Sequence, residues 1–143
     1  MLGFETIGNA TITAFDDAPV ITTDPWIKGK PYFGSWSHAY KIPKEQLNNI
    51  YKSKYIWFSH GHPDHIDPDS LDFFKEKTFL IPDHYGDRIF NDLSKNYKCQ
   101  KVKSNTWIDL SKNIRIKSFA DWNQDSSLLI EIAKKDIIFN LND

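Results

Sequence analysis

Cysteine is almost absent from this sequence: Cys99 is the only one among 143 residues. A single cysteine cannot form a disulfide within the chain, and chains without disulfides are typical of reducing compartments. No apolar run approaches the roughly 18 residues of a membrane span. The first residues, Met1 to Glu5, lack the basic start and the apolar core of a signal peptide. We therefore expect a cytoplasmic protein without a membrane partner.

An excess of charge of one sign is lacking as well. The 18 Lys and Arg residues nearly balance the 19 Asp and Glu residues, and there is no basic block. Nucleic-acid-binding surfaces are usually strongly basic, so we expect no nucleic-acid partner. A chain of this length fits one domain with a moderate core, and it contains no internal repeat or linker.

Strand and helix patterns alternate in the middle of the chain, and strand patterns fill both ends. Weak alternation over 4–15, with a turn at Gly8-Asn9, predicts a β-hairpin, and a third strand is expected over 20–23. The middle predicts helices over 43–52, from Pro68 through Phe74 and over 86–95, between strands over 55–59, 78–82 and 97–102. The remainder predicts strands over 106–110, 113–119, 127–133 and 136–141, with a tight turn at Lys134-Lys135. This order indicates an α/β fold with a mixed sheet.

Residues that bind metals are concentrated directly after the buried strand expected over 55–59. The segment 59–65 reads Ser-His-Gly-His-Pro-Asp-His and holds three of the five histidines. Neutral imidazole and carboxylate are the ligands that a borderline divalent metal prefers. Surface histidines in a polar turn are the alternative, but this grouping after a buried strand favours a metal site.

The spacing within this segment predicts two pairs of ligands. His60 and His62 are two residues apart, so extended backbone points both the same way. A turn at Pro63 would direct Asp64 and His65 at a second point nearby. Two pairs from one loop predict two metals about 3.5–4 Å apart, as in two-metal hydrolysis.

The motif His-x-His-x-Asp-His resembles the signature of the metallo-β-lactamase superfamily. The resemblance implies an αββα sandwich and one or two zinc, manganese or iron ions. Asp24-Pro25-Trp26 and Gly34-Ser35-Trp36 make the chain similar to the branch that contains the ascorbate-phosphate lactonases and the non-Rieske part of CMP-sialic acid hydroxylase. We expect residues 1–143 to form only the first half of such a domain, incomplete at its C-terminus, with an oligomer or a missing C-terminal half completing it.

The resemblance also implies ligands further along the chain. Where the family has its next histidine, after the strand over 113–119, this sequence has Asp121, with Asp125 as the competing position. Asp143, after a buried strand, is the candidate that bridges two metals. The expected ligands are therefore His60, His62, Asp64, His65, Asp121 and Asp143, and carboxylates among them favour Mn²⁺ or Fe²⁺ over zinc.

Other polar residues have two interpretations each. Asp24 is either a turn residue before proline or a hydrogen-bond partner of a metal-bound histidine. The long aromatic segment 26–40 either folds over the core or forms a substrate-binding wall with Trp36 and His38. His84, at a strand-to-helix turn, is expected to cap or to be exposed.

These residues favour a metal-dependent hydrolase that acts with a metal-bound water on an ester, lactone or phosphodiester, such as one of a sugar derivative. Asp64 is the expected catalytic residue, since it could orient that water. One alternative is a component of a CMP-sialic acid hydroxylase-like oxygenase, whose Rieske cluster a single cysteine cannot supply. The other is a non-catalytic scaffold. We do not expect this length of chain to be active alone.

Overall fold

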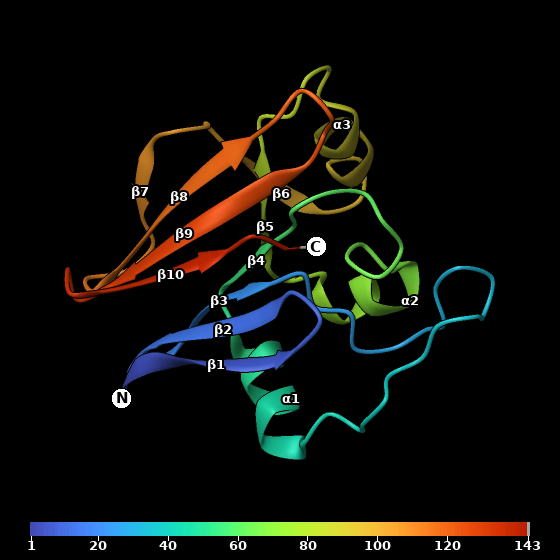
Figure 1. Cartoon of the computed structure of the whole chain (residues 1–143), viewed down its shortest axis with the longest axis horizontal. Helices are drawn as coiled ribbons and strands as arrows, with labels where there is room; N and C mark the ends of the chain where they lie inside the picture. The colour runs from blue at the N-terminus through green and yellow to red at the C-terminus, as the bar shows by residue number, and fades with distance from the viewer. Residues whose placement is uncertain (143) are drawn as a thin grey trace.

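Two β-sheets pack face to face in the computed structural model, which describes residues 1–142, and all the helices lie on the outer side of the first sheet (Figure 1). The strands of the first sheet follow the chain order: β1 (Leu2–Gly8), β2 (Thr11–Asp16), β3 (Ala18–Thr23), β4 (Tyr55–Trp57), β5 (Thr78–Pro82) and β6 (Lys98–Val102). The second sheet contains β7 (Trp107–Asp109), β8 (Ile114–Ala120), β9 (Ser126–Ile132) and β10 (Asp136–Asn140), in the order β10-β9-β8-β7.

The first sheet changes from antiparallel to parallel at β3. Strands β1 to β3 form antiparallel pairs, and β3 to β6 pair in parallel. Parallel neighbours need a crossover, and helices provide it here. The crossovers are α1 (Lys44–Lys52), α2 (Pro68–Leu71) with a 3-10 turn η1 (Asp72–Phe74), and α3 (Arg88–Leu93). The predicted α/β class with a mixed sheet and helices is confirmed.

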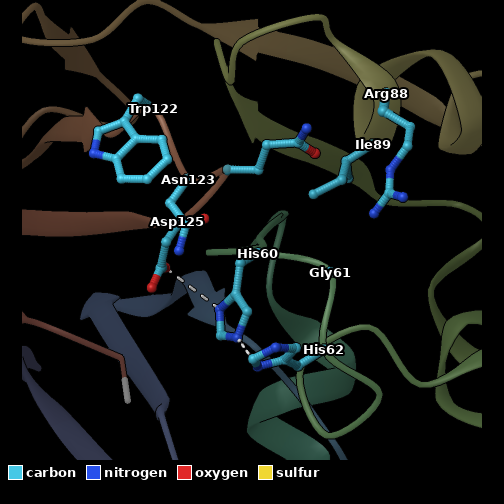
Figure 2. A pocket seen from close by; sticks show the side chains of 9 residues that line it. His60, Gly61, His62, Arg88, Ile89, Trp122, Asn123 and Asp125 are labelled. Atoms are coloured by element: carbon cyan, nitrogen blue, oxygen red, sulfur yellow. Dashed lines mark hydrogen bonds and ion pairs between the residues drawn. The ribbon is translucent and has the colours of Figure 1, made fainter.

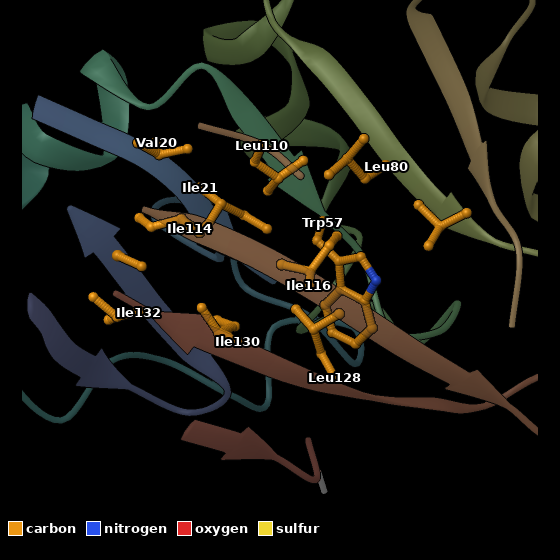
Figure 3. Close-up of a cluster of buried hydrophobic side chains, with 12 residues drawn as sticks. Val20, Ile21, Trp57, Leu80, Leu110, Ile114, Ile116, Leu128, Ile130 and Ile132 are labelled. Carbon is orange, nitrogen blue, oxygen red and sulfur yellow. The ribbon is translucent and has the colours of Figure 1, made fainter. Parts of the chain in front are cut away.

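Central strands β4 and β5 are buried on both faces, which is why they are continuous apolar runs in the sequence. Trp57 and Leu80 point into the core between the sheets, and Ile56 and Phe79 point toward the helices. Figure 3 shows the first core, in which apolar side chains of the two sheets meet. Packing on both faces holds β4 in place, and β4 is the strand that leads into the histidine-rich segment.

Two local features differ from the sequence-based expectation. The helix expected from Pro68 through Phe74 is split, because α2 ends at Leu71 and η1 continues it. The last hairpin turns at Ala133-Lys134 rather than at Lys134-Lys135. Both turn residues have positive φ, and Lys135 N donates to Ile132 O at 3.1 Å. That geometry gives a tight turn with two left-handed central residues, within the three-residue loop 133–135.

The aromatic segment after β3 is anchored on the start of α2. Asp67 caps α2 by accepting from Ser70 N at 2.8 Å, and Ser70 Oγ accepts from the backbone N–H groups of Ile27 and Lys28. Gly29 has φ +87°, and a Cβ there would lie 2.6 Å from Asp67 Oδ1. A residue with a side chain would therefore push the carboxylate away from the helix it caps.

We expect Gly29→Ala to lower the free energy of unfolding by about 2–3 kcal/mol, which combines a strained positive φ with a weakened cap. Gly34→Ala is the matched control, because Gly34 has φ +85° and nothing within 4 Å of the added Cβ. That change should cost about 1 kcal/mol from backbone strain alone. Urea unfolding of both variants measures the difference; equal costs would show that the contact with Asp67 does not matter.

No helix in residues 1–142 has the length and apolar character needed to cross a membrane.

Candidate metal centre

The histidine-rich segment lies where three parallel strands end. Asp24 follows β3, the segment 59–65 follows β4, and His84 follows β5. The loop between β8 and β9 reaches the same edge from the second sheet and carries Asp125. Carboxyl ends of parallel strands are the usual place for ligand sites in α/β folds, so the fold brings these polar groups together there.

His60 and His62 form a close pair. Nε2 of His60 lies 2.7 Å from Nδ1 of His62, and the two rings meet edge to face (Figure 2). The other nitrogen of His60, Nδ1, lies 2.8 Å from Ser59 Oγ and 3.5 Å from Asp125 Oδ1. His60 is buried and His62 is exposed. One nitrogen of each ring thus faces the other across a hydrogen bond, with Ser59 and Asp125 on the far side of His60.

Asp64 and His65 form the second pair predicted from the sequence. Asp64 Oδ2 lies 3.5 Å from His65 Nε2. The opposite nitrogen, His65 Nδ1, lies 3.1 Å from Asp24 Oδ2 and 3.3 Å from Ser59 Oγ. Asp24 and His65 are both fully buried, and Asp24 Oδ1 also accepts from Ser59 N at 2.8 Å. This geometry agrees with the interpretation of Asp24 as a partner of a ligand histidine, since a carboxylate there fixes the tautomer and orientation of the ring.

Two residues that the sequence did not single out hold Asp64. Asn9 Nδ2 donates to Asp64 Oδ2 at 3.0 Å, and Tyr32 OH donates to Oδ1 at 2.8 Å. Burial would raise the pKa of Asp64, but the hydrogen bonds from Asn9 and Tyr32 and the nearby His65 outweigh it and lower the pKa below its ordinary value. Asp64 is therefore kept ionised, and each of its carboxylate oxygens accepts a hydrogen bond from one of these two side chains.

The loop between β8 and β9 brings Asp125, rather than Asp121, to the histidines. Asp121 is exposed, and its Oδ1 accepts from Asn123 N at 2.8 Å and Asp125 N at 3.0 Å, which closes its own loop. Asp125 faces Nδ1 of His60 and accepts from Asn142 Nδ2 at 2.9 Å. The geometry therefore gives no support to Asp121 as the replacement for the family histidine, and it places Asp125 behind His60. Asp143, the predicted bridge, lies outside the described residues.

His84 is buried, which corrects the expectation of a cap or an exposed residue. Its Nε2 donates to Ser59 O at 2.9 Å, and Ser126 Oγ donates to the same carbonyl at 2.5 Å. Two donors thus fix the backbone at the start of the histidine segment. Burial lowers the pKa of His84, outweighing the Ser59 contact and the charges of Asp125, Asp121 and Asp83.

His84 should make stability depend on pH. Its pKa is lowered in the fold, so the unfolded chain binds a proton more readily and stability falls as pH drops below the ordinary value of 6.5. His84→Gln keeps an N–H donor but cannot titrate. Urea unfolding with chelator present, from pH 7.5 to about 5.5, should show a steeper decline in the wild type than in this variant. Parallel curves would contradict the assignment.

The donor set suits a divalent metal in its chemistry. Three imidazoles and the Asp64 carboxylate gather on one short loop, and each buried histidine has a second partner that orients its far nitrogen. Within residues 1–142 the donors meet as two pairs, and no group of three or more that could hold a metal ion is found. The described residues thus offer two half-sites that further donors would complete.

A pocket of about 310 Å³ opens above the first pair. Its lining residues are His60, Gly61, His62, Arg88, Ile89, Trp122, Asn123, Gln124 and Asp125. The two predicted substrate-binding residues are not among them. His38 stacks on Trp26 with ring centroids 4.1 Å apart, and half-exposed Trp36 packs on Tyr32. Their part in substrate binding stays a prediction.

Comparison with known proteins found sequence relatives that share one name and solved structures that share the fold. No family model matches it. The cytidine monophosphate-N-acetylneuraminic acid hydroxylase of Asterias rubens is 28% identical over 138 residues, covering 87% of this chain and 19% of that protein. The Cricetulus griseus protein of the same name is 25% identical over 118 residues, covering 76% and 21%. The chain therefore spans about a fifth of the length of these curated relatives.

Solved structures share the fold at low sequence identity. A possible metal-dependent hydrolase from Veillonella parvula superposes with a TM-score of 0.74 at 12% identity, covering 100% of this chain and 63% of that one. CmlA, a diiron β-hydroxylase from Streptomyces venezuelae, gives 0.70 at 12% identity, covering 97% and 29%. An isothiocyanate hydrolase from Delia radicum gut bacteria gives 0.68 at 12% identity, covering 95% and 60%. These likenesses show a metallo-β-lactamase-like fold, as predicted.

Proposed function

We propose that this chain forms the metal-binding part of a metallo-β-lactamase-like hydrolase that cleaves an ester, lactone or phosphodiester. The observation that carries the proposal is the pair of half-sites on one loop, His60 with His62 and Asp64 with His65. The fold that the chain shares with metal-dependent hydrolases supports it. Zinc, manganese or iron are the metals that such donors accept.

The residues of the chain have separate roles in this proposal. His60 Nε2 and His62 Nδ1 hold one ion, and Asp64 and His65 contribute to a second. Ions bound there would polarise a carbonyl or phosphoryl group and lower the pKa of water to near neutrality.

Residues behind the ligands keep them in place. Asp125 and Ser59 orient His60, and Asp24 orients His65. Asn9 and Tyr32 hold Asp64 ionised, so that it can orient the attacking water as a hydrogen-bond acceptor.

Hydrolysis of three chromogenic or titratable probes tests the proposal: 4-nitrophenyl acetate, γ-butyrolactone and bis(4-nitrophenyl) phosphate. We expect turnover of at least one probe by protein loaded with Zn²⁺, Mn²⁺ or Fe²⁺, and none after treatment with chelator. Asp64→Asn should abolish turnover, while Asp136→Asn, which changes an exposed aspartate of β10, should keep it. Metal binding without turnover of any probe would favour a non-catalytic scaffold.

A second candidate is a component of an oxygenase similar to the CMP-sialic acid hydroxylases. The sequence relatives carry that name, and a diiron β-hydroxylase shares the fold. Cys99 is half-buried, and burial raises its pKa to about 11, so the thiol is poorly suited to bind iron. A Rieske cluster would have to come from outside these 143 residues. Iron–sulfur absorbance in the natural complex would favour this candidate.

A further inference from the structure

The pocket above His60 and His62 has two walls that come from different parts of the fold. One wall is the start of α3, with Arg88 and Ile89, and the other is the loop between β8 and β9, with Trp122 (Figure 2). The two histidines lie at its floor. A ligand bound in this pocket would therefore lie beside both Arg88 and Trp122.

Arg88 reaches over the floor of the pocket. Its Nη2 would lie 3.8 Å from a Cβ built on Gly61, the residue between the two histidines. Figure 2 shows the guanidinium pointing from α3 toward Gly61 and His62. The cationic group thus lies close to where a substrate would bind, rather than extending away from the pocket.

The acidic neighbours of Arg88 are paired with other residues. Asp87 accepts from Lys101 Nζ at 2.7 Å, and Asp92 accepts from Lys95 Nζ at 2.8 Å. Within residues 1–142, Arg88 itself makes no ion pair. The charge of Arg88 also acts on Asp92, but no ion pair with another described residue holds the guanidinium, which is therefore available to a ligand.

The negative charge on the opposite wall is already engaged. Oδ1 of Asp125 accepts from Ser126 N at 2.6 Å and from Asn142 Nδ2 at 2.9 Å, and it faces His60. Trp122, on the same loop, is 86% exposed. Trp122 also lines the pocket, so its open indole face can pack against a ring or an apolar body of a bound molecule.

We propose that Arg88 is a specificity-determining residue that binds a carboxylate or phosphate group of the substrate, while Trp122 packs against the body of the same molecule. The proposal rests on the hydrolase function proposed above and narrows its substrates to small organic anions. The planar guanidinium donates two parallel hydrogen bonds to either anion, and a pocket of about 310 Å³ holds one such molecule.

Binding of three small probes tests this inference by NMR titration: benzoate, phenyl phosphate and the neutral benzamide. Wild-type protein should bind at least one of the two anions about tenfold more tightly than benzamide. The anion that binds more tightly shows whether Arg88 prefers a carboxylate or a phosphate. Arg88→Gln should remove that preference, and Arg88→Lys should restore part of it. Lys98→Gln is the matched control, since it removes one exposed positive charge at the start of β6, outside the pocket, and leaves the ion pairs of Asp87 and Asp92 intact.

Each other outcome has a defined meaning. If no anion binds better than benzamide, or if Arg88→Gln keeps the full preference, the inference is wrong. Trp122→Ala should lower the affinity for all three probes by a similar factor. If it leaves these affinities unchanged, Trp122 is not part of the site.

The titrations are run with chelator and with metal. Loss of anion binding on metal removal alone, with no effect of Arg88→Gln, would assign the anion to the metal and overturn the role of Arg88. If the protein binds no metal but still shows a preference for anions that depends on Arg88, the hydrolase proposal is wrong and the anion site is supported.

Discussion

Replacing His60 or His62 by alanine is expected to lower metal affinity by at least about an order of magnitude, because each change removes one nitrogen from a pair that needs both. The two nitrogens lie 2.7 Å apart at the base of a polar pocket, so either change leaves the other histidine as an incomplete set. Elemental analysis after dialysis against a metal buffer measures the loss. Full occupancy in either variant would remove the pair from the site.

His38→Ala is the matched control for this experiment. It deletes the same chemical group, but His38 is exposed and stacks on Trp26 rather than facing the pocket. Thermal unfolding is needed as well, because His60 is 5% exposed and its removal leaves a small void. A variant that stays folded and loses metal identifies a ligand; a variant that unfolds is replaced by His60→Gln, which fills the same space.

The sequence carried enough information for most of the fold. Strands β4 and β5 are short apolar runs between turn residues, and the helices between the parallel strands have their own apolar periodicity. Local patterns of this kind depend on neighbours within a few residues, so they can be predicted without knowing the tertiary structure. The turn at Ala133-Lys134 was missed by one residue because neither residue is a usual former of positive φ.

The proximity of His60 to His62 and of Asp64 to His65 could be predicted because all four residues lie on one loop, and their role as metal ligands stays a prediction. Their supporting residues could not be predicted. Asn9 and Tyr32 reach Asp64 from 55 and 32 residues away, and His84 reaches Ser59 from 25 residues away. Such contacts depend on the register of the sheet and the path of the aromatic segment, which no local pattern encodes. Asp24 is intermediate: its place at the end of β3 suggested a role, but only the structure shows it against His65.

The loop between β8 and β9, which carries Asp121 and Asp125, gives the second large expected effect. Asp125→Ala should lower metal affinity about 10- to 100-fold, because the His60 ring loses the carboxylate that orients its far nitrogen. Asp121→Asn should leave metal affinity unchanged, since the amide oxygen can still accept from Asn123 N and Asp125 N and keep the loop closed. The two variants each remove one negative charge from the same loop, so a general electrostatic effect would lower both affinities equally.

Competition between Zn²⁺ and Mn²⁺ at equal free concentration separates a ligand from an orienting residue. If Asp121 is a ligand after all, Asp121→His should keep a site and shift its preference toward zinc, since imidazole is the softer donor. If Asp125 acts only through His60, Asp125→Asn should recover part of the lost affinity without changing the preference, because its oxygen can still face His60 Nδ1 at the present 3.5 Å. Loss of metal in Asp121→Asn with full binding in Asp125→Ala would show that the loop rearranges around the ion.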